Sequence, residues 1–124
     1  MNKFFRRILI GLIIAALPFL VGMAAWDLKA NTSKIGIWYP ALVAFAWAVG
    51  FSIASCIYFK GVKKKEAIGE GWITGITWYV ELLIIEYLVL VIGMGQTMME
   101  FAPIFLTYLN TIAISAAIGY IISK

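Results

Sequence analysis

Four long apolar stretches, separated by short polar segments, make up most of this chain of 124 residues. They cover about residues 8–26, 37–59, 72–95 and 101–123. A helix needs about 20 apolar residues to cross the hydrocarbon core of a bilayer, and helices satisfy their own backbone hydrogen bonds there. The sequence therefore predicts an all-α, polytopic membrane protein, in which residues 1–124 form a single four-helix transmembrane bundle with short loops.

The amino-acid composition supports the same class of protein. Hydrophobic residues make up 64% of the chain and charged residues 13%, whereas a soluble domain has about 45–50% apolar and about 25% charged residues. The net charge of +4 comes from basic residues beside the apolar stretches and not from a basic face of a folded domain. We therefore expect no nucleic-acid partner.

The distribution of lysine and arginine predicts the orientation of the helices. The N-terminal arm carries three of them, the second loop four and the C-terminus one, against two in the first loop and none in the third. By the positive-inside rule both termini are cytoplasmic, in a multi-pass cell-membrane protein. The second loop contains Lys60, Lys63, Lys64 and Lys65. These lysines either only set the orientation or also contact anionic lipid, at about 1 kcal/mol each.

Two residue types that often carry chemistry are scarce. Histidine is absent, and Cys56 is the one cysteine, inside an apolar stretch. The chain therefore lacks histidine-based metal and haem sites, Ser-His or Cys-His nucleophiles, and any disulfide or Cys-x-x-Cys pair. We expect no cofactor, no metal and no enzymatic activity, and we interpret Cys56 as a packing residue.

The third stretch carries two carboxylates, Glu81 and Glu86. Ionisable residues inside a membrane are costly and usually face a bundle interior or a watery cavity. Counted from Trp72, Glu81 lies about 14 Å along the helix, near the midplane, and Glu86 about 21 Å along it. Five residues place the two acids about 140° apart around the helix. Both avoid lipid only if this helix is central or lies in a subunit interface, so we predict a homo-oligomer.

Other polar residues fall at similar depths on neighbouring helices. In an antiparallel arrangement Asn110 is expected near the level of Glu86, and Ser115 near that of Glu81. Ser52 of the second stretch also reaches that level, while Thr77 and Tyr79 lie on the third helix itself. The predicted ion- or substrate-binding residues are Glu81, Glu86, Asn110, Ser115, Ser52, Thr77 and Tyr79.

Small residues recur every four positions in two of the stretches. One ridge consists of Ala46, Gly50 and Ala54, and the other of Thr107, Thr111, Ser115, Gly119 and Ser123. Ridges of this kind let a neighbouring helix approach closely, so they predict helix contacts.

The sequence favours transport over other functions. No Lys, Arg or His is expected at the depth of the two acids, and desolvation then favours the neutral carboxyl. Such a group can exchange a proton for a cation, which suits a proton- or cation-coupled transporter or channel with a site around buried Glu81. The alternatives are a non-catalytic subunit or assembly scaffold of a larger membrane complex, or neutral acids that hydrogen-bond to Asn110, Ser115 or Ser52 and hold the helices together.

Aromatic residues flank the two acids. Trp78, Tyr79 and Tyr87 lie close to them in sequence, and aromatic faces beside an acid suit an organic cation. A four-helix chain of this size with a membrane glutamate among aromatic residues resembles, in outline, the small multidrug transporters. Here the acid is on the third helix and not the first, and the lysine and arginine bias is strong.

Overall fold

The computed structural model describes residues 2–93, 95 and 97–124. Met1 of the predicted N-terminal arm, Met94 of the third apolar stretch and Gln96 of the third loop lie outside the described residues. The regular structure of the described part is helical, apart from one β-hairpin whose two strands have two residues each. Four of its helices are long and apolar enough to cross a membrane. The prediction of four long apolar helices is confirmed.

The elements follow one another in the order of the apolar stretches. They are α1 (Lys3–Ala24), β1 (Trp26–Asp27), β2 (Thr32–Ser33), η1 (Gly36–Trp38), α2 (Tyr39–Phe59), η2 (Lys64–Glu66), α3 (Ala67–Glu86), the π-helix η3 (Tyr87–Gly93), α4 (Met98–Phe101), α5 (Pro103–Thr107) and α6 (Leu109–Ser123). Strands β1 and β2 pair antiparallel, with Trp26 opposite Ser33.

Local chemistry accounts for several helix boundaries. The Asn2 side chain accepts a hydrogen bond of 2.8 Å from the Phe4 backbone N–H and so caps α1. Pro40 lies in the first turn of α2, where its missing N–H leaves no helical bond unmade. Pro103 also lacks an N–H group and so cannot donate the next helical hydrogen bond after α4. The predicted fourth stretch is therefore interrupted there, and α5 begins at Pro103.

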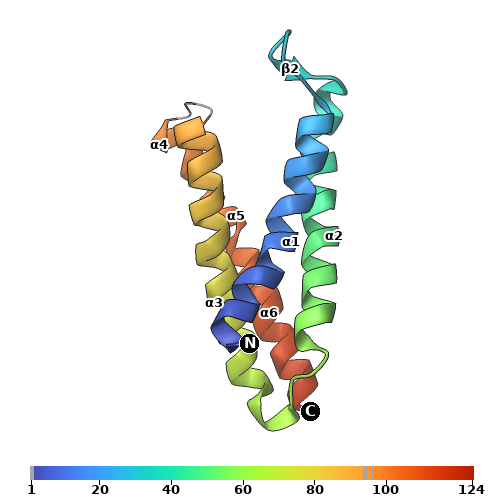
Figure 1. The fold of residues 1–124 in the computed structure, drawn as a ribbon, viewed down its shortest axis with the longest axis vertical. Coiled ribbons are helices and arrows are strands. Elements are labelled where there is room, and N and C mark those ends of the chain that lie inside the picture. The colour runs from blue at the N-terminus through green and yellow to red at the C-terminus, as the bar shows by residue number, and fades with distance from the viewer. Residues whose placement is uncertain (1, 94, 96) are drawn as a thin grey trace.

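The long helices form two helical hairpins, as Figure 1 shows. Helix α1 packs along α2, and α3 packs along α6. The two hairpins meet at the end of the molecule that holds both chain termini. They diverge toward the end that carries β1 and β2 on one hairpin and α4 on the other (Figure 1). We call these the terminal end and the hairpin end.

Trp78 is the centre of the core where the two hairpins meet. Its side chain is fully buried. The rings of Phe51, Tyr58 and Phe59 surround it edge-on, with centroid distances of 5.7, 6.0 and 6.5 Å. Since these three rings belong to α2 and Trp78 belongs to α3, this cluster joins one hairpin to the other. Aromatic pairs in this geometry add about 0.5–1.5 kcal/mol each beyond their buried area.

Both small-residue ridges lie in helix contacts. Ala46, Gly50 and Ala54 are buried in α2, and a Cβ built on Gly50 would lie 3.0 Å from the Ile13 carbonyl oxygen of α1. In the second ridge Thr111, Ser115 and Gly119 are buried, whereas Thr107 is exposed. The prediction of close helix contacts at the two ridges is confirmed for these buried positions.

Two glycines of α3 provide a direct test of this packing. A Cβ on Gly71 would lie 2.7 Å from the Ser115 carbonyl oxygen, whereas a Cβ on Gly69 would meet nothing within 4 Å. We expect Gly71→Ala to lower the free energy of unfolding in detergent by about 1–3 kcal/mol. Gly69→Ala should raise it by about 0.5–1 kcal/mol, because alanine is the better helix former. Equal effects of the two substitutions would contradict the close contact of α3 with α6.

Three further differences between the predicted segment boundaries and the structure bear on the site. Helix α1 begins at Lys3 and not at residue 8. Helix α3 begins at Ala67, so the second half of the predicted polar loop, including Glu70, is helical. The third long helix changes to a π-helix at Tyr87, directly after Glu86. The first two differences share one physical cause: charged residues pair with each other at the terminal end, which lets the helices extend beyond their apolar stretches.

Candidate functional site

The Glu81 carboxyl group lies buried between α3 and α1. Neither of its two oxygens has a hydrogen-bond partner in the part of the chain that the structure describes. Gly11 of α1 makes the space for this group: a Cβ built there would overlap Glu81 Oε1 and would lie 2.8 Å from Trp78 Cδ1. Any residue other than glycine at position 11 would therefore displace the carboxyl group or the indole ring.

The polar residues predicted to surround Glu81 lie elsewhere. Ser115 donates its hydroxyl proton to the Gly71 carbonyl at 2.7 Å, ten residues before Glu81 on α3. Ser52 is exposed and donates to the Ala48 carbonyl of its own helix at 2.8 Å. Asn110 is exposed as well. The interpretation of Glu81 as a neutral acid that bonds to these residues is therefore wrong, because helix depth alone does not give the rotation of each helix about its axis.

Glu86 occupies a different environment. It ends α3, directly before η3, and its carboxyl group lies beside the Tyr108 hydroxyl between α5 and α6. The Tyr108 ring stacks on Trp47 of α2, with centroids 6.1 Å apart and planes 12° apart. The two acids thus face different groups, as their predicted separation around the helix requires. Both acids are partly buried within the single chain.

The two remaining predicted residues donate to backbone carbonyl groups. Thr77 donates its hydroxyl proton to the Ile73 carbonyl of its own helix at 2.8 Å. Tyr79 donates its hydroxyl proton to the Phe105 carbonyl at 2.8 Å and so ties α3 to α5. Neither side chain bonds to Glu81 or Glu86, so the structure assigns them to packing around the site.

A buried charged cluster, which the sequence did not predict, closes the terminal end. It consists of Arg7 of α1, Tyr58 of α2, and Glu70 and Thr74 of α3, and we call it the Arg7 cluster. Arg7 Nη2 donates to Glu70 Oε2 at 2.8 Å, and Arg7 Nε donates to the Tyr58 hydroxyl at 2.8 Å and to Thr74 Oγ1 at 3.2 Å. The Tyr58 hydroxyl in turn donates to Glu70 Oε2. Arg7 and Glu70 are each only 8% exposed.

Two further contacts extend the Arg7 cluster toward solvent and toward Glu81. On the solvent side, Lys3 donates to Glu70 Oε1 at 3.3 Å. On the other side, Trp78 Nε1 donates to the Arg7 carbonyl oxygen at 2.8 Å. The indole of Trp78 therefore stands between the Arg7 cluster and the Glu81–Gly11 contact.

Glu70 and Glu81 share one face of α3. They are eleven residues apart, which corresponds to three turns with an offset of about 20° and an axial separation of about 16 Å. This face packs on α1, since Arg7 and Gly11 of α1 contact it at successive turns. One acid on the face is fully paired and the other has no partner among the described residues.

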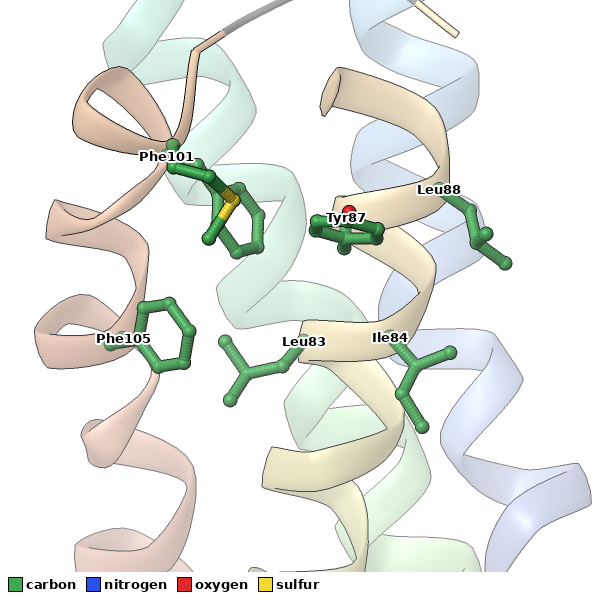
Figure 2. A pocket seen from close by; sticks show the side chains of 7 residues that line it. Leu83, Ile84, Tyr87, Leu88, Phe101 and Phe105 are labelled. Atoms are coloured by element: carbon green, nitrogen blue, oxygen red, sulfur yellow. The ribbon is translucent and has the colours of Figure 1, made fainter. Parts of the chain in front are cut away.

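Two surface hollows lie away from the contact of Glu81 with Gly11. One, of about 270 Å³, opens at the terminal end beside the Arg7 cluster and is lined by Lys3, Arg6, Tyr58, Gly61, Val62, Lys63, Glu66 and Glu70. The other, of about 220 Å³, lies toward the hairpin end between α3, η3, α4 and α5 (Figure 2). It is lined by Leu83, Ile84, Tyr87, Leu88, Met98, Phe101 and Phe105. This second hollow is apolar and includes neither Glu81 nor Glu86.

No protein-family model, curated protein or solved structure matches this chain.

Proposed function

We propose that this protein crosses a cell membrane four times, with both termini in the cytoplasm, and transports a proton or a small cation through a site centred on Glu81. The observation that carries the proposal is the buried Glu81 carboxyl group, whose two oxygens have no partner among the described residues. A buried polar group without a hydrogen bond costs about 1–3 kcal/mol. A bound proton or cation would remove this cost, which supports an ion-binding role for Glu81.

The arrangement of the two hairpins supports a transport cycle. The hairpins meet at the terminal end, where the Arg7 cluster joins α1, α2 and α3, and they diverge at the hairpin end (Figure 1). A site between two bodies that close at one end and part at the other is suited to alternating access, in which the bodies rock around a fixed site. In this proposal the present arrangement is closed toward the cytoplasm.

A flux assay with a conservative substitution tests the proposal. The purified protein is reconstituted into vesicles, and proton and monovalent cation fluxes are compared for the parent, Glu81→Gln and Glu100→Gln. Glu81→Gln keeps the size of the side chain and removes its charge, so flux is expected to fall to the level of empty vesicles. Glu100→Gln is the matched control: Glu100 is exposed in the capping box of α4, where Gln also serves, so flux should be unchanged.

Two results would refute the transport proposal. One is equal flux in Glu81→Gln and the parent. The other is the absence of flux above empty vesicles in the parent itself.

The second candidate function is that of a non-catalytic subunit or assembly scaffold in a larger membrane complex. The hollow of Figure 2 favours it, because a concave surface between helices offers close packing to a helix of another membrane protein. This function predicts that a partner co-purifies with the protein and is lost on Leu83→Asn, and that the isolated protein gives no flux. Homo-oligomer formation and contact of Lys60, Lys63, Lys64 and Lys65 with anionic lipid belong to either proposal.

A further inference from the structure

Arg7 and Gly11 of α1 contact the same face of α3, one helical turn apart. Arg7 meets Glu70 and Thr74, and Gly11 meets Glu81. Four residues correspond to about 6 Å along α1. The backbone of the buried arginine therefore lies about one turn from the level of Glu81. Its guanidinium is paired with Glu70, and the Trp78 indole separates it from Glu81.

In the proposed transport cycle, Glu81 needs a nearby positive charge at some steps and not at others. While a proton or cation is bound, the carboxyl group needs no counter-charge. Once the cation leaves, a buried carboxylate without a partner remains, which is strongly unfavourable. Arg7 is the buried cation on the facing helix. Its long side chain would reach Glu81 by turning toward Gly11, or by a slide of α1 over about one turn, and either movement requires the Trp78 indole to move aside. One-turn shifts of one element past another are an established kind of switching motion.

We propose that Arg7 is a positioning residue that exchanges Glu70 for Glu81 when Glu81 loses its cation, and that this exchange opens the terminal end. The inference rests on the proposed function, because it assigns to that site the step that couples ion release to opening. In the described state the ion pair of Arg7 with Glu70 also holds Tyr58 of α2. When Arg7 leaves, the three helices lose their common charged contact, and water can enter from the cytoplasmic side.

The substitution Ser55→Cys provides a reporter of opening at the terminal end. Ser55 lies one turn from Tyr58 on α2, is buried, and its hydroxyl has no partner within the described residues. Ser55→Cys is close to isosteric, and Cys56→Ser removes the native thiol, which is exposed on the same helix. The measured quantity is the rate at which a water-soluble maleimide labels the introduced thiol in reconstituted protein. Four proteins are compared in this background: the parent, Glu70→Gln, Glu81→Gln and the double substitution.

The inference makes labelling depend on both acids together. With Glu81 present, Glu70→Gln frees Arg7 to pair with Glu81. Labelling is then expected to accelerate about tenfold or more, because a tenfold change needs only a modest shift in the free-energy difference between the closed and open states. In the Glu81→Gln background Arg7 has no second acid, and Glu70→Gln should accelerate labelling by less than about threefold. Equal acceleration in the two backgrounds would overturn the inference, since it would mean that Glu70→Gln only loosens the structure.

Two further variants keep the test decisive. Lys3→Gln removes the exposed lysine that also bonds to Glu70, and it should leave the labelling rate unchanged. If Glu70→Gln does not fold, it is replaced by Glu70→Asp, which keeps the charge but shortens the side chain and so weakens the contact with Arg7. It is compared in the same two backgrounds, and a smaller acceleration that still requires Glu81 is expected; equal acceleration in both would overturn the inference.

Failure of this inference is distinguishable from failure of the proposed function, because labelling does not require transport. Flux that depends on Glu81, together with equal labelling acceleration in the two backgrounds, would leave transport intact and remove the exchange by Arg7. Labelling that depends on both acids without flux above empty vesicles would keep the exchange and remove transport.

Discussion

Glu70→Ala is expected to lower the free energy of unfolding by about 3–5 kcal/mol, the cost of breaking a buried ion pair by removing one partner. The substitution leaves the Arg7 guanidinium buried without its carboxylate and removes the acceptor of the Tyr58 hydroxyl proton. Because these contacts join α1, α2 and α3, the loss affects the packing of one hairpin on the other and not only a local bond.

Unfolding in mixed detergent micelles, followed by circular dichroism, measures this effect. The matched control is Glu66→Ala, because Glu66 pairs with Lys3 at 3.8 Å at the protein surface. An exposed pair of this kind contributes about 0–1 kcal/mol. Replacing both members of the buried pair, with Arg7→Met and Glu70→Leu together, should recover part of the loss, since apolar residues can substitute for a buried pair. Similar small effects of Glu70→Ala and Glu66→Ala would contradict a buried Arg7 cluster.

Glu81→Met is expected to have the opposite effect on stability and to raise the free energy of unfolding by about 1–3 kcal/mol. Methionine is unbranched like glutamate, so it fits the space that Gly11 leaves, and it removes two buried oxygens that have no partner among the described residues. A substitution that stabilises the fold and abolishes the activity is expected where the original residue serves the function and lowers the stability.

The same unfolding measurement, combined with the flux assay, tests this expectation. Glu81→Gln is the matched control, because its amide is also a polar group without partners at that position and should leave stability nearly unchanged. A loss of stability in Glu81→Met would show that the carboxyl group contributes to packing, and it would weaken the case for an ion site at Glu81.

The four long helices could be predicted because their length and apolar character are local properties of the sequence. Their rotation about their own axes could not be predicted in the same way. Asn110 and Ser52 are exposed, not turned toward Glu81, although their depths match. In a helix that is apolar on all sides, no polar face fixes which side meets a neighbour. The small-residue ridges did give the correct contact sides, because close backbone approach excludes larger side chains.

The site could be predicted only in part. Glu81 stood out as a carboxylate inside an apolar stretch, which is a local property. The ion pair of Arg7 with Glu70 joins residues 63 positions apart. Both lie in charged flanks of the apolar stretches, where the sequence alone indicates only orientation and a loop. The role of Gly11 also depends on a contact between distant segments, since glycine at that position is explained only by Glu81 and Trp78 across the interface.

The π-helical segment η3 was likewise not predictable from hydropathy. Its residues are as apolar as those of α3, so composition gives no reason for the change of helix type at Tyr87. Segments of this kind are rare and often occur at functional sites. Here it begins directly after Glu86, which makes this acid the end of the regular part of the third helix.

Attachment of the two hairpins at one end also sets the scale of their motion. Helix α1 extends about 26 Å beyond Arg7 to its end at Ala24, so a rotation of about 10° about the Arg7 cluster would displace that end by about 4–5 Å. A small rotation about a point near one end of the helix thus produces a much larger displacement at the other end. Sub-ångström adjustments beside Arg7 would become displacements of several ångströms at the opposite end of the bundle.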